Sequence, residues 1–180
     1  MGVDLRPVQT SDEEFLFSVY ASTRADEMKL VPWTETQKQD FLRMQFNAQR
    51  QHYAVYYPKA QYHVIERDGE AIGRMIVDRS EDTILLMDIA LLPEYHNAGI
   101  GTRLIKELLD EADKENRPVQ LHVETFNPAI KLYKRLGFVK SGEMGIYHEM
   151  TRQSASDARR QIALDHRTED KIKGVKADAR

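Results

Sequence analysis

The chain has 180 residues, 41% of them hydrophobic and 31% charged, and a formal net charge of −3. This length predicts one domain with room for a tail. The absence of cysteine excludes disulfides, a thiol nucleophile and a cysteine-ligated zinc site. No apolar run approaches the ~20 residues of a membrane span, and the amino terminus lacks the apolar core of a signal peptide. We therefore expect no membrane partner and a cytoplasmic location.

Charge is unevenly distributed along the chain. Residues 151–180 contain eight Lys or Arg and five Asp or Glu, whereas the first 150 residues are net acidic. An acidic body argues against nucleic-acid binding and is compatible with a basic acceptor such as an amine. Because residues 151–180 contain no aromatic residue, we expect a polar tail that is partly helical or disordered, with a basic docking arm as the alternative.

The amino-terminal part predicts a strand followed by two helices. Residues 3–8 fit an edge strand, since Pro7 cannot donate to a ladder. Two overlapping capping boxes then predict a helix start; they pair Thr10 with Glu13 and Ser11 with Glu14. Residues 21–31 are expected to be the helix end and a loop. Thr34 is the predicted N-cap of the second helix.

Aromatic residues gather around this second helix. Trp33 precedes it, and Tyr53, Tyr56 and Tyr57 follow near its end. Core packing explains such a cluster, and so does the wall of an acceptor pocket.

A β-meander is predicted next. Residues 61–67 and 71–78 alternate around Asp68-Gly69, which is a strong two-residue hairpin turn. Residues 83–91 are almost all apolar, which is typical of a central strand covered on both faces.

The stretch from Asp88 to Thr102 organises the chain. It combines the end of this strand, the glycines Gly99 and Gly101, and a helix expected to run to about residue 116. The first N–H groups of a helix have no partner, and glycine lets an anion approach them. The pattern therefore predicts a phosphate-binding loop.

The last part of the chain adds a strand, a helix and two strands. Residues 119–124 alternate as a strand, with His122 and Glu124 on one face. Asn127 is the predicted N-cap of a helix that ends at Gly137. Short strands are expected at 138–140 and 145–150, around a turn at 141–143. The order β-α-α-β-β-β-α-β-α-β-β predicts an α/β fold (α+β) with a mixed sheet and helices on both faces.

Two motifs resemble those of the GNAT N-acetyltransferase superfamily. Residues 91–104, LLPEYHNAGIGTRL, resemble its acetyl-CoA loop, written Arg/Gln-x-x-Gly-x-Gly/Ala, with His96 at the opening position. Residues 127–138, NPAIKLYKRLGF, resemble its closing helix. The resemblance covers about residues 3–150 and implies a GNAT-like domain over 1–150, with 151–180 outside it.

The resemblance implies an enzyme that transfers an acetyl group from acetyl-CoA to an amine, without a metal. Cofactor-binding positions follow from the motifs: Ile89, Ala90 and Leu91 for the pantetheine arm, Asn97, Ala98, Gly99, Ile100, Gly101 and Thr102 for the pyrophosphate, and also Asn127 and Tyr133. Tyr133 would protonate the departing thiolate, and a backbone N–H near Leu91 would stabilise the carbonyl oxygen.

The general base stays open at this point. His122 occupies the position where family members carry a carboxylate, and histidine ordinarily titrates near pH 6.5. Glu124, on the same face, and Asp88, on the central strand, are the alternatives. A polar strand face explains the first two equally well.

The acceptor cannot be read from the sequence, since fold does not give substrate. A small-molecule amine and a peptide N-terminus both fit, and the chain could act as a monomer or a homodimer. The alternative function is a non-catalytic acyl-CoA-binding sensor or interaction module.

Overall fold

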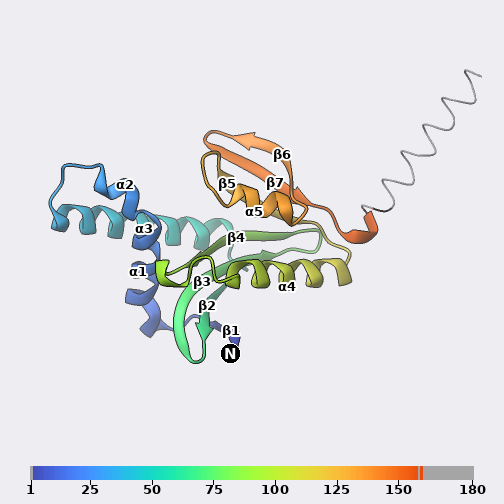
Figure 1. The fold of residues 1–180 in the computed structure, drawn as a ribbon, viewed down its shortest axis with the longest axis horizontal. Coiled ribbons are helices and arrows are strands. Elements are labelled where there is room, and N and C mark those ends of the chain that lie inside the picture. Colours follow the sequence, from blue (N-terminus) through green and yellow to red (C-terminus); the bar gives the residue numbers. More distant parts are fainter. Residues whose placement is uncertain (1, 158, 160–180) are drawn as a thin grey trace, which may run out of the picture. The chain divides into compact units, whose positions relative to one another are not determined.

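The computed structural model describes residues 2–157 and 159 (Figure 1). The chain divides into two compact units. The first comprises residues 1–81 and 85–105, and the second comprises 82–84 together with the residues from 106 onward. Of the tail expected at 151–180, residues 158 and 160–180 lie outside the described part.

The first unit contains four strands and most of the helices. Its elements are β1 (Val3–Pro7), η1 (Thr10–Asp12), α1 (Glu13–Thr23), α2 (Ala25–Lys29), α3 (Glu35–Tyr56), β2 (Gln61–Arg67), β3 (Glu70–Arg79), β4 (Ile84–Leu91) and η2 (Pro93–Tyr95). The strand order is β1-β2-β3-β4, with β1 antiparallel to β2 and β2 antiparallel to β3. Pro7 lies on the edge strand, as expected.

The second unit contains three strands. Helix α4 (Ile100–Lys114) continues into it from the first unit and is followed by β5 (Val119–Glu124), α5 (Ile130–Arg135), β6 (Val139–Met144) and β7 (Tyr147–Arg152). The order here is β5-β7-β6, with both pairs antiparallel. The interleaved order of strands and helices agrees with the predicted α+β class.

Aromatic and aliphatic side chains from helices α1 and α3 form a core cluster of the first unit. Phe17 and Tyr20 of α1 pack against Leu42 and Phe46 of α3. The ring centroid of Phe46 lies 5.7 Å from that of Phe17 and 5.6 Å from that of Tyr20. Buried aromatic pairs of this kind supply much of a small core's hydrophobic energy.

The start of α1 differs from the predicted capping boxes. A short 3-10 turn precedes the helix, and the carboxylate of Asp12 accepts a 2.7 Å hydrogen bond from the Gln9 N–H. Asp12 is also held by both guanidinium nitrogens of Arg6, at 2.7 and 2.8 Å. The capping boxes on Thr10 and Ser11 were therefore wrong, because the ion pair with Arg6 and the hydrogen bond from Gln9 favour Asp12 instead.

The segment expected to be a loop at 21–31 is mostly helical. Helix α1 continues to Thr23, and the separate helix α2 covers Ala25–Lys29. In contrast, the start of α3 is confirmed, since the Thr34 hydroxyl accepts a 3.3 Å hydrogen bond from the Gln37 N–H.

The final hairpin is longer than predicted. Residues 141–143 lie inside β6, and the turn is at Gly145, which has φ +59°. A register shift between Lys140 and Gly142 lets the strand continue through this polar stretch, which resembled a turn in the sequence.

The predicted domain boundary at residue 150 stays a prediction. Strand β7 crosses it and ends at Arg152, which forms an ion pair with Asp113 of α4. The Ala155 N–H also donates to Asp113, at 2.8 Å. Within the described part of the chain, no helix has both the length and the apolarity that crossing a bilayer requires.

Candidate active site

The loop between β4 and α4 has the geometry expected of a phosphate-binding loop. Asn97 and Gly99 both have positive φ, at 59° and 77°. The Arg103 N–H makes the first helical hydrogen bond, to the Gly99 carbonyl, at 3.0 Å. The N–H groups of Ile100, Gly101 and Thr102 precede that bond, so an anion can accept from them.

Space for a ligand lies over this loop. A Cβ built at Gly99 or Gly101 would meet no atom within 4 Å. A cavity of about 210 Å³ is lined by Ala98, Gly99 and Ile100 of the loop, together with Arg103 of α4, Arg67 of β2 and Val3 of β1.

The two arginines of this cavity were not predicted as site residues. Arg103 stands one turn into α4, and Arg67 comes from the end of β2, 36 positions earlier in the sequence. Guanidinium groups are the strongest phosphate partners among side chains. A basic residue before a hairpin turn carries no sequence signal for this role, because only the folded sheet brings it to the loop.

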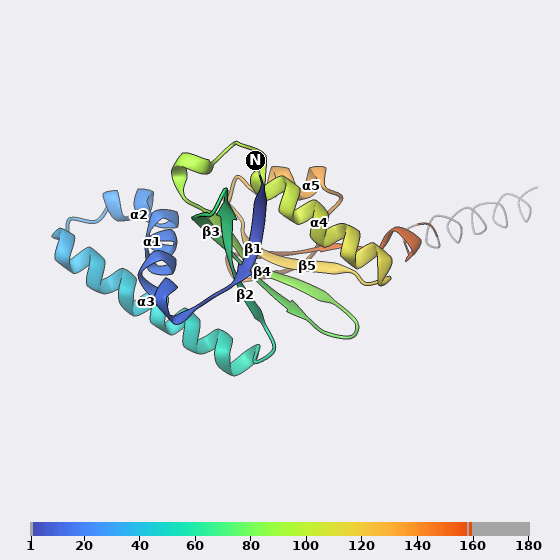
Figure 2. The same cartoon turned by 90° about the horizontal axis from the view of Figure 1, so that it is seen from below.

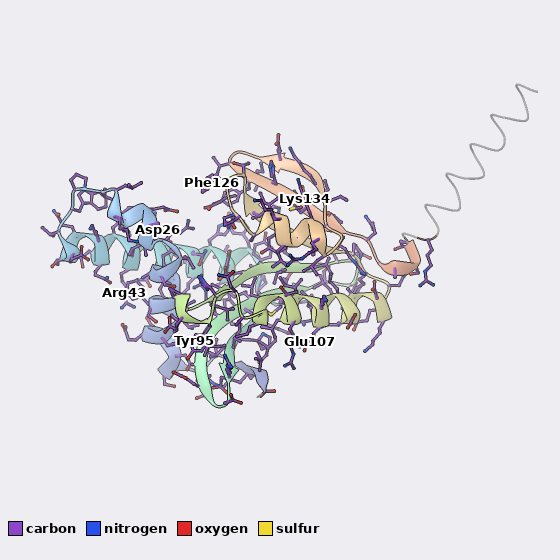
Figure 3. The ribbon with its side chains drawn as sticks, in the orientation of Figure 1. Asp26, Arg43, Tyr95, Glu107, Phe126 and Lys134 are labelled. Carbon is purple, nitrogen blue, oxygen red and sulfur yellow. The ribbon has the colours of Figure 1, made fainter. Side chains whose placement is uncertain are left out.

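His96 has a structural partner inside the loop. Its Nε2 lies 2.8 Å from the Leu91 carbonyl oxygen, which can only accept, so Nε2 carries the proton. The residue that replaces the motif's usual Arg or Gln therefore closes the turn that follows β4. Tyr95, from the same turn and labelled in Figure 3, donates a 3.0 Å hydrogen bond to the Glu70 carboxylate.

At the end of β4, the backbone is hydrogen-bonded to β3 along one edge. The Leu92 N–H donates to the Ile72 carbonyl of β3, at 2.9 Å. Because successive residues of a strand alternate their N–H directions, the Leu91 N–H points away from β3. Of the predicted pantetheine positions, Ala90 is buried and Ile89 and Leu91 are half-buried.

Asp88 has an ion-pair partner on the neighbouring strand. Its Oδ2 lies 2.6 Å from Nε of Arg74, whose side chain is 6% exposed. This pairing of β4 with β3 favours a structural role for Asp88 over the role of general base.

In the second unit, the two other base candidates share one face of β5. Val119, Leu121 and Val123 are buried, while His122 is exposed and Glu124 is half-buried on the opposite face. The antiparallel register places Glu149 of β7 directly opposite His122, and Tyr147 opposite Glu124. Glu149 was not predicted as a site residue, since only the strand pairing brings it to His122.

Asn127 and Tyr133 flank the start of α5. The Asn127 side chain accepts a 2.9 Å hydrogen bond from the Ala129 N–H in the turn before α5. The predicted N-cap at Asn127 was wrong, because the α-helix begins at Ile130 and its N-cap is Ala129, two residues later in the chain. Tyr133 is buried, with its ring edge-on to Phe138 at 5.8 Å. Gly137 then ends the helix with φ +90°, as predicted.

The segment that contains these residues matches a known domain family. Residues 58–140 match the family described as acetyltransferase (GNAT) domain. A Bacillus subtilis (strain 168) protein, provisionally named a [ribosomal protein bS18]-alanine N-acetyltransferase, is 33% identical over 87 residues, covering 47% of this chain and 58% of that protein. An uncharacterised N-acetyltransferase of Methanocaldococcus jannaschii is 29% identical over 130 residues, covering 58% of each chain. The chain thus spans a little over half the length of these curated relatives.

Solved structures share the fold. The PaiA N-acetyltransferase of Thermoplasma acidophilum, crystallised in complex with coenzyme A, superposes with a TM-score of 0.66 at 19% identity, covering 85% of this chain and 99% of that one. This likeness confirms the predicted fold class, and together with the sequence matches it supports the predicted superfamily. Residues 58–140 thus match the GNAT acetyltransferase family, and the chain has the fold of the GNAT acetyltransferases.

Proposed function

We propose that this protein is an N-acetyltransferase that moves an acetyl group from acetyl-CoA to a primary amine by direct attack. The observation that carries the proposal is the open loop at Gly99, which lies within the GNAT-matched segment and is bordered by two arginines. These residues fit the pyrophosphate of acetyl-CoA, since helix N–H groups and guanidinium groups both bind phosphate.

Different residues are proposed to bind different parts of acetyl-CoA. The N–H groups from Asn97 to Thr102 hold the pyrophosphate, with Arg67 and Arg103 beside it. The backbone of Ile89, Ala90 and Leu91 lies along the pantetheine arm. Asn127 is a further proposed cofactor-binding residue by its motif, and its side-chain oxygen accepts a hydrogen bond from the Ala129 N–H.

The reaction needs a donor for the carbonyl oxygen. Acetyl-CoA supplies the acetyl thioester, whose carbonyl oxygen gains negative charge as the amine nitrogen attacks. The Leu91 N–H, which points away from β3, is the proposed donor. One pre-oriented backbone donor of this kind contributes about 3 kcal/mol of transition-state stabilisation.

Two proton transfers complete the exchange. The Tyr133 hydroxyl donates a proton to the departing thiolate, so the carbon–sulfur bond breaks without releasing a bare anion. The base takes the proton that the attacking amine must lose. We propose His122 for this role, with Glu124 as the alternative on the same strand face and Glu149 orienting the imidazole from β7.

The proposed acceptor is a peptide N-terminus or a small amine. The Bacillus relative is provisionally named as an N-acetyltransferase of an alanine in ribosomal protein bS18. The acidic first 150 residues are compatible with either amine, because both are cationic before they react.

Tyr133→Phe tests the catalytic proposal. Thiol release from acetyl-CoA is measured against a panel of amines and amino-terminal peptides. We expect kcat to fall by about 100-fold or more, because general acid catalysis contributes 10²–10⁴-fold. Tyr56→Phe is the matched control, since Tyr56 is 67% exposed on α3 and its variant should keep full activity.

Two results would contradict the proposal. Unchanged kcat in Tyr133→Phe removes the acid role. If the wild-type protein does not bind coenzyme A in calorimetry, the assignment of the loop and the proposed enzymatic activity are both wrong. Binding of coenzyme A without turnover of any acceptor favours the alternative function, a non-catalytic sensor.

A further inference from the structure

A second and larger cavity lies on the helical side of the first unit. It has a volume of about 770 Å³ and is mostly apolar. Its walls come from the carboxyl-terminal half of α3, from β2 and β3, and from the residues after β1; they include Phe46, Tyr53, Tyr57, Tyr62, His63 and Arg74. Figure 2 shows this half of α3 beside the start of β2. None of the predicted cofactor-binding residues lines this cavity.

The sequence of α3 explains why the cavity is there. Leu42, Phe46, Gln49 and Tyr53 recur at helical spacing and share one face. Leu42 and Phe46 fill the core, at 3% and 1% exposed. One turn further, the same face changes to Gln49 and Tyr53, which are half-buried and line the cavity instead of filling it.

The charges in the wall are compensated. Arg74 is paired with Asp88 at 2.6 Å and donates to the Gln49 side-chain oxygen at 3.4 Å. Arg50 is paired with Glu13 at 3.3 Å. Among the residues that the structure describes, the lining contains no Asp or Glu, so these two carboxylate partners lie outside it. Neither a cation nor an anion therefore finds an uncompensated partner here, and burying a charged ligand would be costly.

Two titratable groups of the wall, His63 and Tyr53, are neutral near pH 7. Burial lowers the pKa of His63, assisted by Arg79, so its imidazole is uncharged. Burial raises the pKa of Tyr53 to about 12, so its hydroxyl stays protonated. The rings of Tyr53 and Tyr57 stand edge-on at 6.1 Å, which leaves flat aromatic walls with hydroxyl groups at their ends.

We infer that this cavity binds a neutral aromatic molecule carrying a single N–H or O–H group. Its volume is that of a small-molecule site, the aromatic rings provide stacking surfaces, and the tyrosine hydroxyls and the Gln49 amide provide hydrogen bonds. The site is separate from the acetyl-CoA loop, and its occupancy does not depend on acetyl transfer.

Calorimetric titration of the full chain with indole tests the inference, in the absence of acetyl-CoA. Indole-3-acetate and tryptamine carry the same ring with a negative and a positive charge. We expect saturable one-to-one binding of indole, at about tenfold or more higher affinity than either charged analogue, because the cavity has no partner for a charge.

Two α3 variants locate the binding. Ala54→Phe places a ring into the cavity from its wall, whereas Ala48→Phe makes the same change at an exposed position of α3 outside the lining. We expect Ala54→Phe to weaken indole binding by about tenfold or more, as its ring displaces the ligand, and Ala48→Phe to leave it unchanged. Gln51→Trp, also on the wall, serves the same purpose where Ala54→Phe does not fold, as judged by circular dichroism.

The inference is overturned by any of three results: no saturable binding of indole, tighter binding of a charged analogue, or equal affinity in wild type and the folded wall variant. Since coenzyme A is absent from these titrations, such a failure leaves the proposed acetyltransferase activity untouched, and the thiol-release assay decides that activity independently.

Discussion

Gly73 shows how a single missing side chain sets the distance between two strands. It lies in the middle of β3, and a Cβ at this position would stand 2.3 Å from the Ala90 carbonyl oxygen and 3.0 Å from the Leu91 Cα. Both are backbone atoms of β4 and cannot rotate away. Glycine is therefore required here by the close approach of β4, at the residues proposed to lie along the pantetheine arm.

Gly73→Ala is expected to destabilise the protein by about 1–3 kcal/mol, because β4 must shift to admit the methyl group. Urea unfolding measures this loss. Gly101→Ala is the control: its Cβ would meet no atom within 4 Å, and a helical position gains about 0.5–1 kcal/mol from the same change. Equal stability of Gly73→Ala and wild type would show that the strands approach less closely than described.

Other single residues also acquire their roles from partners that only the folded chain brings to them. His96 looked like a departure from a binding motif, yet its ring bonds the Leu91 carbonyl and closes the turn. Asp88 looked like a candidate base, yet Arg74 of β3 holds it at 2.6 Å. Neither partner stands at a regular spacing from the residue it contacts, so no periodic pattern could have indicated these bonds.

Among the elements, α4 was the most predictable and the most informative. Its buried face repeats the predicted stripe, with Ile100, Leu104, Leu108 and Ala112 all buried. A 15-residue helix directs its amino-terminal N–H groups at one point, and Gly99 keeps that point open. The proposed cofactor site is thus a property of the element's end, and side chains contribute only at its border.

Gly99→Ala tests this reading of α4. Its φ of +77° strains an alanine by about 1–2 kcal/mol, and the new methyl group enters the space proposed for the phosphate. We expect coenzyme A to bind about tenfold or more weakly in calorimetry, with the protein still folded. Gly101→Ala should retain binding, since the acetyl-CoA loop motif of the GNAT superfamily has glycine or alanine at the position of Gly101. Loss of binding in Gly101→Ala but not in Gly99→Ala would place the phosphate elsewhere on the loop.

The last strand pair was the least predictable element. A polar stretch with a glycine at 141–143 has the composition of a turn, but in the sheet it forms a bulged strand against β7. The Cβ of an alanine at Gly142 would lie 2.8 Å from the Glu149 carboxylate. The strand tolerates this stretch because its partner supplies the ladder, which a local sequence pattern does not reveal.

At the scale of the whole molecule, an ion-pair cluster of the first unit contributes to stability at low pH. Arg6 of β1 holds Asp12 before α1 through two bonds, and its Nε lies 2.6 Å from the Glu66 carboxylate of β2. The Arg6 guanidinium lowers the pKa of Asp12 from 3.8 to about 2. The folded state therefore binds fewer protons than the unfolded state between these values, so its stability rises with pH across them.

We expect this contribution, about 1–2 kcal/mol after allowance for partial exposure, to be complete above pH 4 and to be lost as the pH falls toward 2. Arg6→Met should remove it and leave the Asp12 carboxylate buried without its main partner. Thermal unfolding at pH 7 and at pH 3 measures the difference: the destabilisation caused by Arg6→Met should shrink at the lower pH. Arg135→Met, a change at an exposed position of α5, is the control that should lower stability little at either pH. The same loss of stability for Arg6→Met at pH 7 and at pH 3 would show that packing of the Arg6 side chain, and not its charge, stabilises this ion-pair cluster.

The sequence by itself determined the order of most elements and the α+β class, and it predicted both the resemblance to the GNAT superfamily and the proposed phosphate-binding loop after β4. These features are local, because hydrophobic periodicity, glycine placement and helix capping act within a few residues. They can therefore be predicted from the sequence alone. Only the tertiary structure decided which partners meet. Arg67 reaches the loop through the β1-β2-β3 register, and Glu149 faces His122 through the pairing of β5 with β7. Tyr53 of α3 and Tyr57 just beyond its end line a cavity because β2 and β3 lie across from them. Such contacts join residues far apart in the chain, and their energies depend on burial and distance, which exist only once the sheet has formed.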